Sequence, residues 1–131
     1  MSKKGTYYEY KVMEIFEKYG YASLRTLGSG GGTKKSKPDV VVGNGRNIFG
    51  MEVKKREDDV CYIQKSQVEE LKDFCYTFGA SPLIVVKFGN MPFYAFDVDS
   101  DSIVETEKSY KIHVDDVGRG WELNKFIVYA T

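Results

Sequence analysis

Two acidic residues and one lysine in the first half of the chain are spaced so that their side chains would meet. Asp39 opens an apolar, β-branched segment, and Glu52 and Lys54 lie two residues apart in a second predicted strand. Side chains alternate between the faces of a strand, so Glu52 and Lys54 point to the same side. A turn at residues 43–45 would join the two strands into a β-hairpin and bring the Asp39 carboxylate close to Glu52.

Two carboxylates this close repel each other unless a proton, a cation or a metal ion lies between them. Mg²⁺ suits the pair, because it takes oxygen ligands, needs only one or two protein carboxylates and keeps positions for water and phosphate oxygens; Mn²⁺ is the expected substitute. Such a metal polarises a phosphodiester and lowers the pKa of an attacking water, while Lys54 would orient that water or neutralise developing charge. The three residues therefore predict metal-dependent phosphodiester hydrolysis.

A plainer interpretation of the same residues is an exposed salt bridge between Glu52 and Lys54, worth under about 1 kcal/mol, with Asp39 capping a turn. The context favours the catalytic interpretation. Pro38 and Asp39 precede an apolar strand, a tight turn follows, and a segment rich in glycine and lysine comes immediately before.

That preceding segment, residues 28–37, is predicted to be the most flexible part of the chain. It is either a surface connector or an arm that folds over a phosphate backbone, and its three lysines favour the arm. The segment lacks the G-x-x-x-x-G-K-[ST] pattern of a phosphate-binding loop, so we expect no nucleotide cofactor.

The formal net charge is zero, but the charges are segregated along the chain. Residues 1–56 hold 12 Lys and Arg against 5 Asp and Glu, which gives 12 − 5 = +7, and residues 57–131 hold 7 against 14, which gives 7 − 14 = −7. A basic surface for nucleic acid is compatible with this distribution, although the halves of a sequence need not map to faces of the fold.

The order of predicted elements indicates an α/β fold, with one mixed sheet flanked by helices in a single domain spanning residues 1–131. The expected helices cover residues 6–19 and 65–78. The expected strands cover residues 22–26, 39–42, 47–55, 83–87, 93–98, a short stretch near Ile112, and 126–129.

Several observations place limits on where the protein works. Aromatic residues make up 15% of the chain, which argues against disorder. Its longest apolar runs, such as residues 83–86, are too short to cross a bilayer, and the first residues lead into no signal peptide. Cys61 and Cys75 form no disulfide framework or metal motif. We therefore expect a cytoplasmic protein with no membrane partner.

The set of Pro38, Asp39, Glu52 and Lys54 resembles the PD-(D/E)xK motif shared by many restriction enzymes and DNA-repair nucleases. A wider pattern across roughly residues 3–98 is similar to the archaeal Holliday junction resolvase family Hjc. The matching features are Lys4-Gly5, Glu9, Arg25, the Gly-Ser-Gly stretch at 28–30, residues 39–45, Glu52 to Lys54, Phe74 to Gly79, and Leu83 to Phe88.

The resemblance implies a restriction-endonuclease-like fold and a homodimer that spans a four-way DNA junction and nicks two strands symmetrically. It implies Glu9, Asp39 and Glu52 as catalytic metal ligands and Lys54 as the catalytic lysine. Phe74 and Phe78, one helical turn apart, would lie at the dimer interface, although core packing would equally explain them. The expected DNA contacts are Lys4, Arg25, Ser29, Lys34, Lys35, Lys37, Lys55 and Arg56.

One position departs from the family pattern, because Tyr10 stands where a basic residue is common. Two alternatives to junction resolution remain. One is a restriction or repair nuclease that acts on duplex or flap DNA, and the other is a non-catalytic DNA-binding module with a nuclease-like fold.

Overall fold

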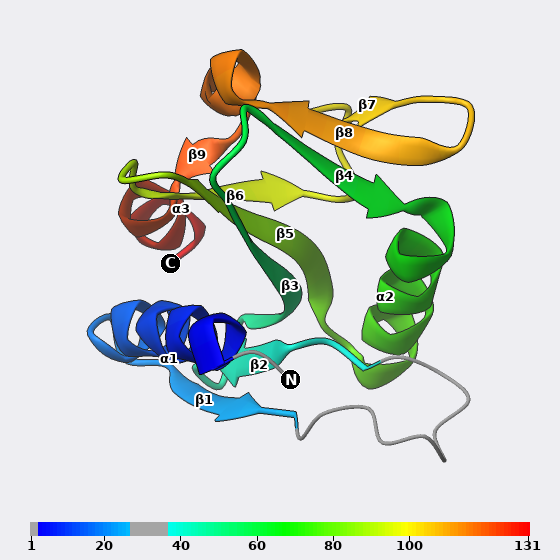
Figure 1. Ribbon diagram of the computed structural model, residues 1–131. Helices are drawn as coiled ribbons and strands as arrows, with labels where there is room; N and C mark the ends of the chain where they lie inside the picture. Colours follow the sequence, from blue (N-terminus) through cyan, green and yellow to red (C-terminus); the bar gives the residue numbers. More distant parts are fainter. Residues whose placement is uncertain (1–2, 27–36) are drawn as a thin grey trace.

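The computed structural model describes residues 3–26 and 37–131, with side chains from residue 5 onward in the first range (Figure 1). In chain order its elements are α1 (Lys3–Glu17), β1 (Ala22–Arg25), β2 (Val40–Gly43), β3 (Ile48–Arg56), β4 (Val60–Gln64), α2 (Lys65–Phe78), β5 (Ser81–Phe88), β6 (Phe93–Asp97), β7 (Val104–Glu105), β8 (Ser109–His113), the 3₁₀ helix η1 (Val114–Arg119), β9 (Trp121–Glu122) and α3 (Leu123–Ala130).

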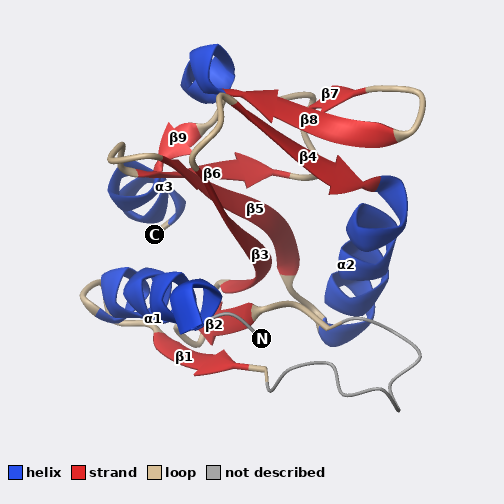
Figure 2. Cartoon of the chain, in the orientation of Figure 1, coloured by secondary structure: helices blue, strands red, loops and turns tan. Residues whose placement is uncertain are grey.

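A six-stranded mixed sheet forms the centre, in the order β1-β2-β3-β5-β6-β9. The β3–β5 pair is parallel and the other pairs are antiparallel. Helices α1 and α3 cover one face of this sheet, and α2 packs against the other (Figure 2). The prediction of a central mixed sheet flanked by helices is confirmed.

The two faces of the sheet belong to two separate hydrophobic clusters. Val85 of β5 packs with Val12 of α1 and Ile127 of α3, whereas its neighbours on β5, Ile84 and Val86, pack on the α2 side. This follows from the alternation of side chains along a strand that is buried on both faces.

The β2–β3 hairpin confirms the predicted turn. Gly45 has φ +90°, a left-handed conformation that glycine adopts without strain. The Asn44 side chain accepts hydrogen bonds from the backbone N–H groups of Arg46 (2.9 Å) and Asn47 (2.7 Å). This turn fixes the register in which Val40 lies opposite Met51, and thereby places Asp39 beside the second half of β3.

The C-terminal prediction was wrong: residues 126–129 do not form a strand but belong to α3. Phe126, Ile127, Val128 and Tyr129 favour strands by intrinsic propensity. Burial overrides that propensity here. Leu123 and Ile127 are four residues apart, so both point from one side of α3 into the core that α1 also covers.

The prediction of one sheet also missed β4. This strand pairs with β8, and β8 pairs with β7, so that a second sheet of three strands covers the α2 side. In β4 the side chains of Cys61 and Ile63 are buried while that of Tyr62 is exposed. Both cysteines, Cys61 and Cys75, are free and buried. No helix in the described part of the chain is long and apolar enough to cross a membrane.

Candidate active site

Asp39 is held rigidly between β1 and β3, one residue before β2 begins. Its backbone N–H donates to Met51 O (2.9 Å), and its carbonyl accepts from Thr26 N (3.1 Å). Its side-chain Oδ2 accepts from the backbone N–H of Val53 at 2.9 Å. The carboxylate is therefore directed at the stretch of β3 that carries Glu52 and Lys54.

Glu52 is buried, with 7% of its surface exposed, and it is the one charged residue in the buried set of the described chain. Lys54 Nζ lies 3.9 Å from Glu52 Oε1, which is an ion-pair distance but too long for a strong hydrogen bond. Burial, and then the neighbouring Asp39 carboxylate, raise the pKa of Glu52 to about 8. The expected convergence of the Glu52 and Lys54 side chains is present.

Glu9 reaches the same region from α1 and is paired with Arg25 of β1. Arg25 Nη1 donates to Glu9 Oε1 at 3.3 Å, and both side chains are more than four-fifths buried. Burial and the Asp39 carboxylate raise the pKa of Glu9, while the hydrogen bond from Arg25 opposes them. The Arg25 Nε atom is buried and has no hydrogen-bond partner in the described structure.

Tyr10, which stands where the sequence pattern led us to expect a basic residue, contacts Arg25. The Arg25 guanidinium lies 5.2 Å from the centroid of the Tyr10 ring, within cation–π range. A basic residue at position 10 would add a second cation next to Arg25. The Tyr10 ring instead packs on the Arg25 guanidinium, which lies beside Glu9.

The site is short of positive charge. Burial also raises the pKa of Asp39, although the Val53 N–H, Lys54 and Arg25 act in the opposite direction. Three carboxyl groups thus have raised pKa values in one region, and each would lose a proton more readily if a cation were present. This is the electrostatic state expected of a cation site, and its donors are the hard oxygens that Mg²⁺ prefers.

The carboxylates do not form a closed cage. Within residues 3–26 and 37–131, no group of three or more His, Cys, Asp or Glu side chains is close enough to hold one ion. The carboxylate oxygens of Asp39 and Glu52 suit a Mg²⁺ ion that keeps most of its positions for water and phosphate oxygens, and the role of Glu9 as a third ligand stays a prediction.

Three residues at the site were not identified from the sequence. Gln67, in the first turn of α2, accepts a hydrogen bond from Lys54 Nζ at 3.4 Å. Glu70, one turn later on the same helix, adds a negative charge near Glu52. Gly50 gives room for the close packing: a Cβ there would lie 2.7 Å from Cys75 Sγ and 3.4 Å from Pro38 Cγ. Only the packing of α2 over β3 reveals these three positions.

The predicted DNA contacts are dispersed. Lys37 is exposed beside Pro38. Lys55 points to the α1 side of β3, where it pairs with Glu57 and lies 5.3 Å from the Tyr8 ring centroid. Arg56 points to the opposite side and donates to Lys55 O at 2.9 Å. The side chain of Lys4 is not described, and the predictions for Ser29, Lys34 and Lys35 lie outside the described residues.

The two predicted interface residues form an aromatic pair on α2. The rings of Phe74 and Phe78 are stacked, with centroids 5.2 Å apart and an interplanar angle of 19°. Phe74 packs partly against the core, whereas Phe78 is 54% exposed.

Comparison with known proteins identifies relatives along nearly the whole chain. The family model for archaeal Holliday junction resolvase (Hjc) matches residues 1–130. The crossover junction endodeoxyribonuclease Hjc of Archaeoglobus fulgidus is 35% identical over 112 residues, which are 86% of this chain and 80% of that protein. The crossover junction endodeoxyribonuclease of Sulfolobus islandicus rod-shaped virus 1 is 38% identical over 89 residues, or 66% of this chain and 73% of that protein.

The fold gives the same result. The structure of the Archaeoglobus fulgidus Hjc, a Holliday junction resolvase from an archaeal hyperthermophile, matches with a TM-score of 0.85 at 31% identity. The match covers 94% of this chain and 99% of that one. The restriction-endonuclease-like fold implied by the motif is therefore confirmed, and the chain belongs to the archaeal Holliday junction resolvase (Hjc) family.

Proposed function

We propose that this chain is a single nuclease domain that resolves four-way DNA junctions by metal-dependent hydrolysis, through paired and symmetric nicks. The observation that carries the proposal is the buried Glu52 carboxylate beside Asp39 and Lys54, in a site with too little positive charge of its own. Membership of the Hjc family supports the choice of a junction as the substrate.

The metal would be held by Asp39 and Glu52. Mg²⁺ bound there would polarise the scissile phosphate and lower the pKa of an attacking water. Asp39 is already oriented for this role, because the hydrogen bond from Val53 fixes one carboxylate oxygen and leaves the other for a ligand. Glu52 must give up its proton to bind a cation, and the neighbouring charge of Lys54 favours that loss.

Lys54 would stabilise the charge that develops on the phosphate. Its ammonium group is held by the Gln67 oxygen at 3.4 Å and by Glu52 at 3.9 Å, so it keeps donor capacity for a phosphate oxygen or a water. Gln67 acts as a positioning residue: it fixes the ammonium group without neutralising it.

The dimer belongs to the proposal as well. Symmetric nicks in two strands need two active sites, which one chain of this size does not contain. The exposed Phe78 ring, stacked on Phe74, is the kind of aromatic anchor that lies at the centre of protein interfaces.

The catalytic assignment can be tested by replacing each carboxylate with its amide. Asp39→Asn retains an oxygen that can accept from Val53 N–H, so the fold should persist while the metal site loses a charge. We expect Asp39→Asn and Glu52→Gln to reduce junction cleavage in Mg²⁺ by roughly a hundredfold or more, with junction binding in EDTA nearly unchanged.

Asp58→Asn is the matched control, since Asp58 is exposed in the turn after β3. It should cleave like the wild type. Retention of cleavage by both active-site variants would refute the assignment of the metal site. If the wild type in Mg²⁺ or Mn²⁺ cleaves no branched DNA, the non-catalytic DNA-binding alternative would take its place.

A further inference from the structure

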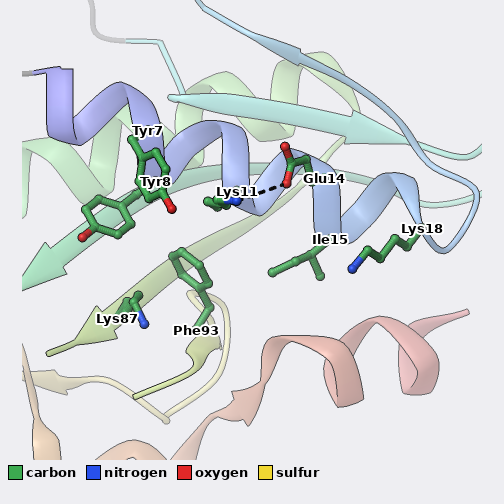
Figure 3. A pocket seen from close by; sticks show the side chains of 8 residues that line it. All are labelled: Tyr7, Tyr8, Lys11, Glu14, Ile15, Lys18, Lys87 and Phe93. Carbon is green, nitrogen blue, oxygen red and sulfur yellow. Dashed lines mark ion pairs between the residues drawn. The ribbon is translucent and has the colours of Figure 1, made fainter. Parts of the chain in front are cut away.

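A second feature lies on the other flank of α1. An open hollow of about 390 Å³ separates α1 from the β5–β6 hairpin (Figure 3). Its walls include Tyr7, Tyr8 and Lys11 of α1 and Phe93 of β6. Tyr8 faces this side and packs edge-on against Phe93 at 6.4 Å, whereas Glu9 faces β1. The hollow is therefore distinct from the carboxylate site, but the two share the N-terminal half of one helix.

The hollow is lined by cations. Lys11, Lys18 and Lys87 border it together with one acid, Glu14, which gives a local charge of 3 − 1 = +2. Lys87 is fixed by a 2.6 Å hydrogen bond to Met91 O. Lys18 is exposed and forms no ion pair within the described residues. This local excess of positive charge favours an anionic partner.

Two of these lysines lie on the same side of the helix. Helical geometry extends to Lys18, because its backbone N–H donates to Glu14 O at 3.1 Å. Seven residues therefore separate Lys11 and Lys18 along the helix, a rise of about 10.5 Å. Seven residues are about two helical turns, so both side chains point to the same side of α1.

We propose that this hollow is a backbone-binding subsite for a duplex arm of the DNA, in which Lys11 and Lys18 contact phosphates of one strand. The inference rests on the proposed function only in that the ligand is DNA. The exposed Tyr7 ring, 5.3 Å from Lys11 Nζ, forms part of the wall of the hollow. A duplex arm is favoured over a small anion because the hollow is open and two of its cations, Lys11 and Lys18, lie one after the other along α1.

A substitution at Glu14 should strengthen DNA binding, whereas loss of the lysines should weaken it. Its Oε1 lies 3.7 Å from Lys11 Nζ, and its side chain is 60% exposed. A phosphate arriving at Lys11 must displace or repel this carboxylate. Replacing Glu14 by the nearly isosteric glutamine should therefore tighten DNA binding, by about two- to fivefold if the exposed pair has an ordinary strength.

The principal test is the salt dependence of junction binding in EDTA, where no cleavage occurs. Each phosphate contact contributes about 0.9 to the slope of log K against log salt. The Lys11→Ala/Lys18→Ala variant should lower that slope by about 1.8 and weaken binding at 0.1 M salt by about 60-fold. Lys108→Ala/Lys111→Ala removes the same charge from the β7–β8 hairpin and serves as the matched control.

The cleavage rate of bound junction in Mg²⁺, measured at saturating protein, should stay at the wild-type value in the Lys11/Lys18 variant. A slope equal to that of the wild type would overturn the subsite, and so would an equal loss in the control, because net charge alone would then explain it. A wild type that binds junctions but does not cleave them would refute the proposed function and leave this binding test intact.

Discussion

Replacement of Glu52 by glutamine should stabilise the metal-free protein at neutral pH, although it removes a proposed catalytic residue. The carboxyl group is 7% exposed, and its pKa rises from the ordinary value of 4.5 to about 8 in the folded protein. In the unfolded chain the group ionises near 4.5, so folding at pH 7 requires it to take up a proton or to bury a charge. The glutamine amide avoids that cost.

The magnitude follows from the two pKa values. The folded state binds this proton more tightly, so the contribution of Glu52 to stability is complete below about pH 4.5 and is lost progressively up to about pH 8. pH 7 lies about 2.5 units above the pKa of Glu52 in the unfolded chain, so the stability lost by pH 7 is about 3 kcal/mol. At pH 5 the stability lost is under about 1 kcal/mol. The gain from Glu52→Gln should therefore grow by about 2 kcal/mol between these pH values.

Urea unfolding in EDTA at pH 5 and pH 7 measures both differences. Glu107→Gln, on an exposed residue of the β7–β8 turn, is the control and should change stability equally little at both pH values. The Glu52→Gln variant could be less stable than the wild type at pH 7, or its gain in unfolding free energy could be the same at both pH values. Either result would show that the pKa of Glu52 is not raised in the folded protein.

Three further predictions follow from the same structure. Mg²⁺ binding should release about one proton, because Glu52 must ionise. For the same reason the apparent Mg²⁺ affinity should rise about tenfold per pH unit between pH 6 and 8. Calorimetry in buffers of different ionisation enthalpy measures the number of protons released. Phe78→Ala should lower the dimer fraction by sedimentation with little change in monomer stability, since the ring is 54% exposed; an unchanged dimer would exclude this surface. Gly50→Ala should destabilise the fold by about 1–3 kcal/mol in urea unfolding, and Cys75→Ala in the same chain should recover part of that loss, because the added Cβ would meet Cys75 Sγ at 2.7 Å.

The sequence predicted the catalytic hairpin well because its determinants are local. Asp39, Glu52 and Lys54 are placed by strand alternation and by one turn, and Asn44 and Gly45 specify that turn. For α2 the observed bounds match the predicted ones, since Val68, Leu71 and Cys75 recur at helical spacing and Gly79 ends the helix in a left-handed conformation.

The features that the sequence did not predict depend on contacts between distant segments. Strand β4 pairs with β8, about fifty residues later, and four consecutive apolar residues at its start hide the alternation of buried and exposed side chains. The helical form of residues 126–129 depends on burial of Ile127 beneath α1, against its own propensity. Gln67 joined the site for the same reason, because only tertiary packing brings α2 to Lys54.

The most direct test of the central claim is cleavage of a mobile four-way junction, compared with a linear duplex and a flap of the same sequences at the same salt. With Mg²⁺, we expect paired nicks at symmetric positions in the junction, little cutting of the other two substrates, and loss of all cutting in EDTA. Equal or faster cutting of duplex or flap would contradict junction resolution, and cleavage that persists in EDTA would contradict the metal site at Asp39 and Glu52.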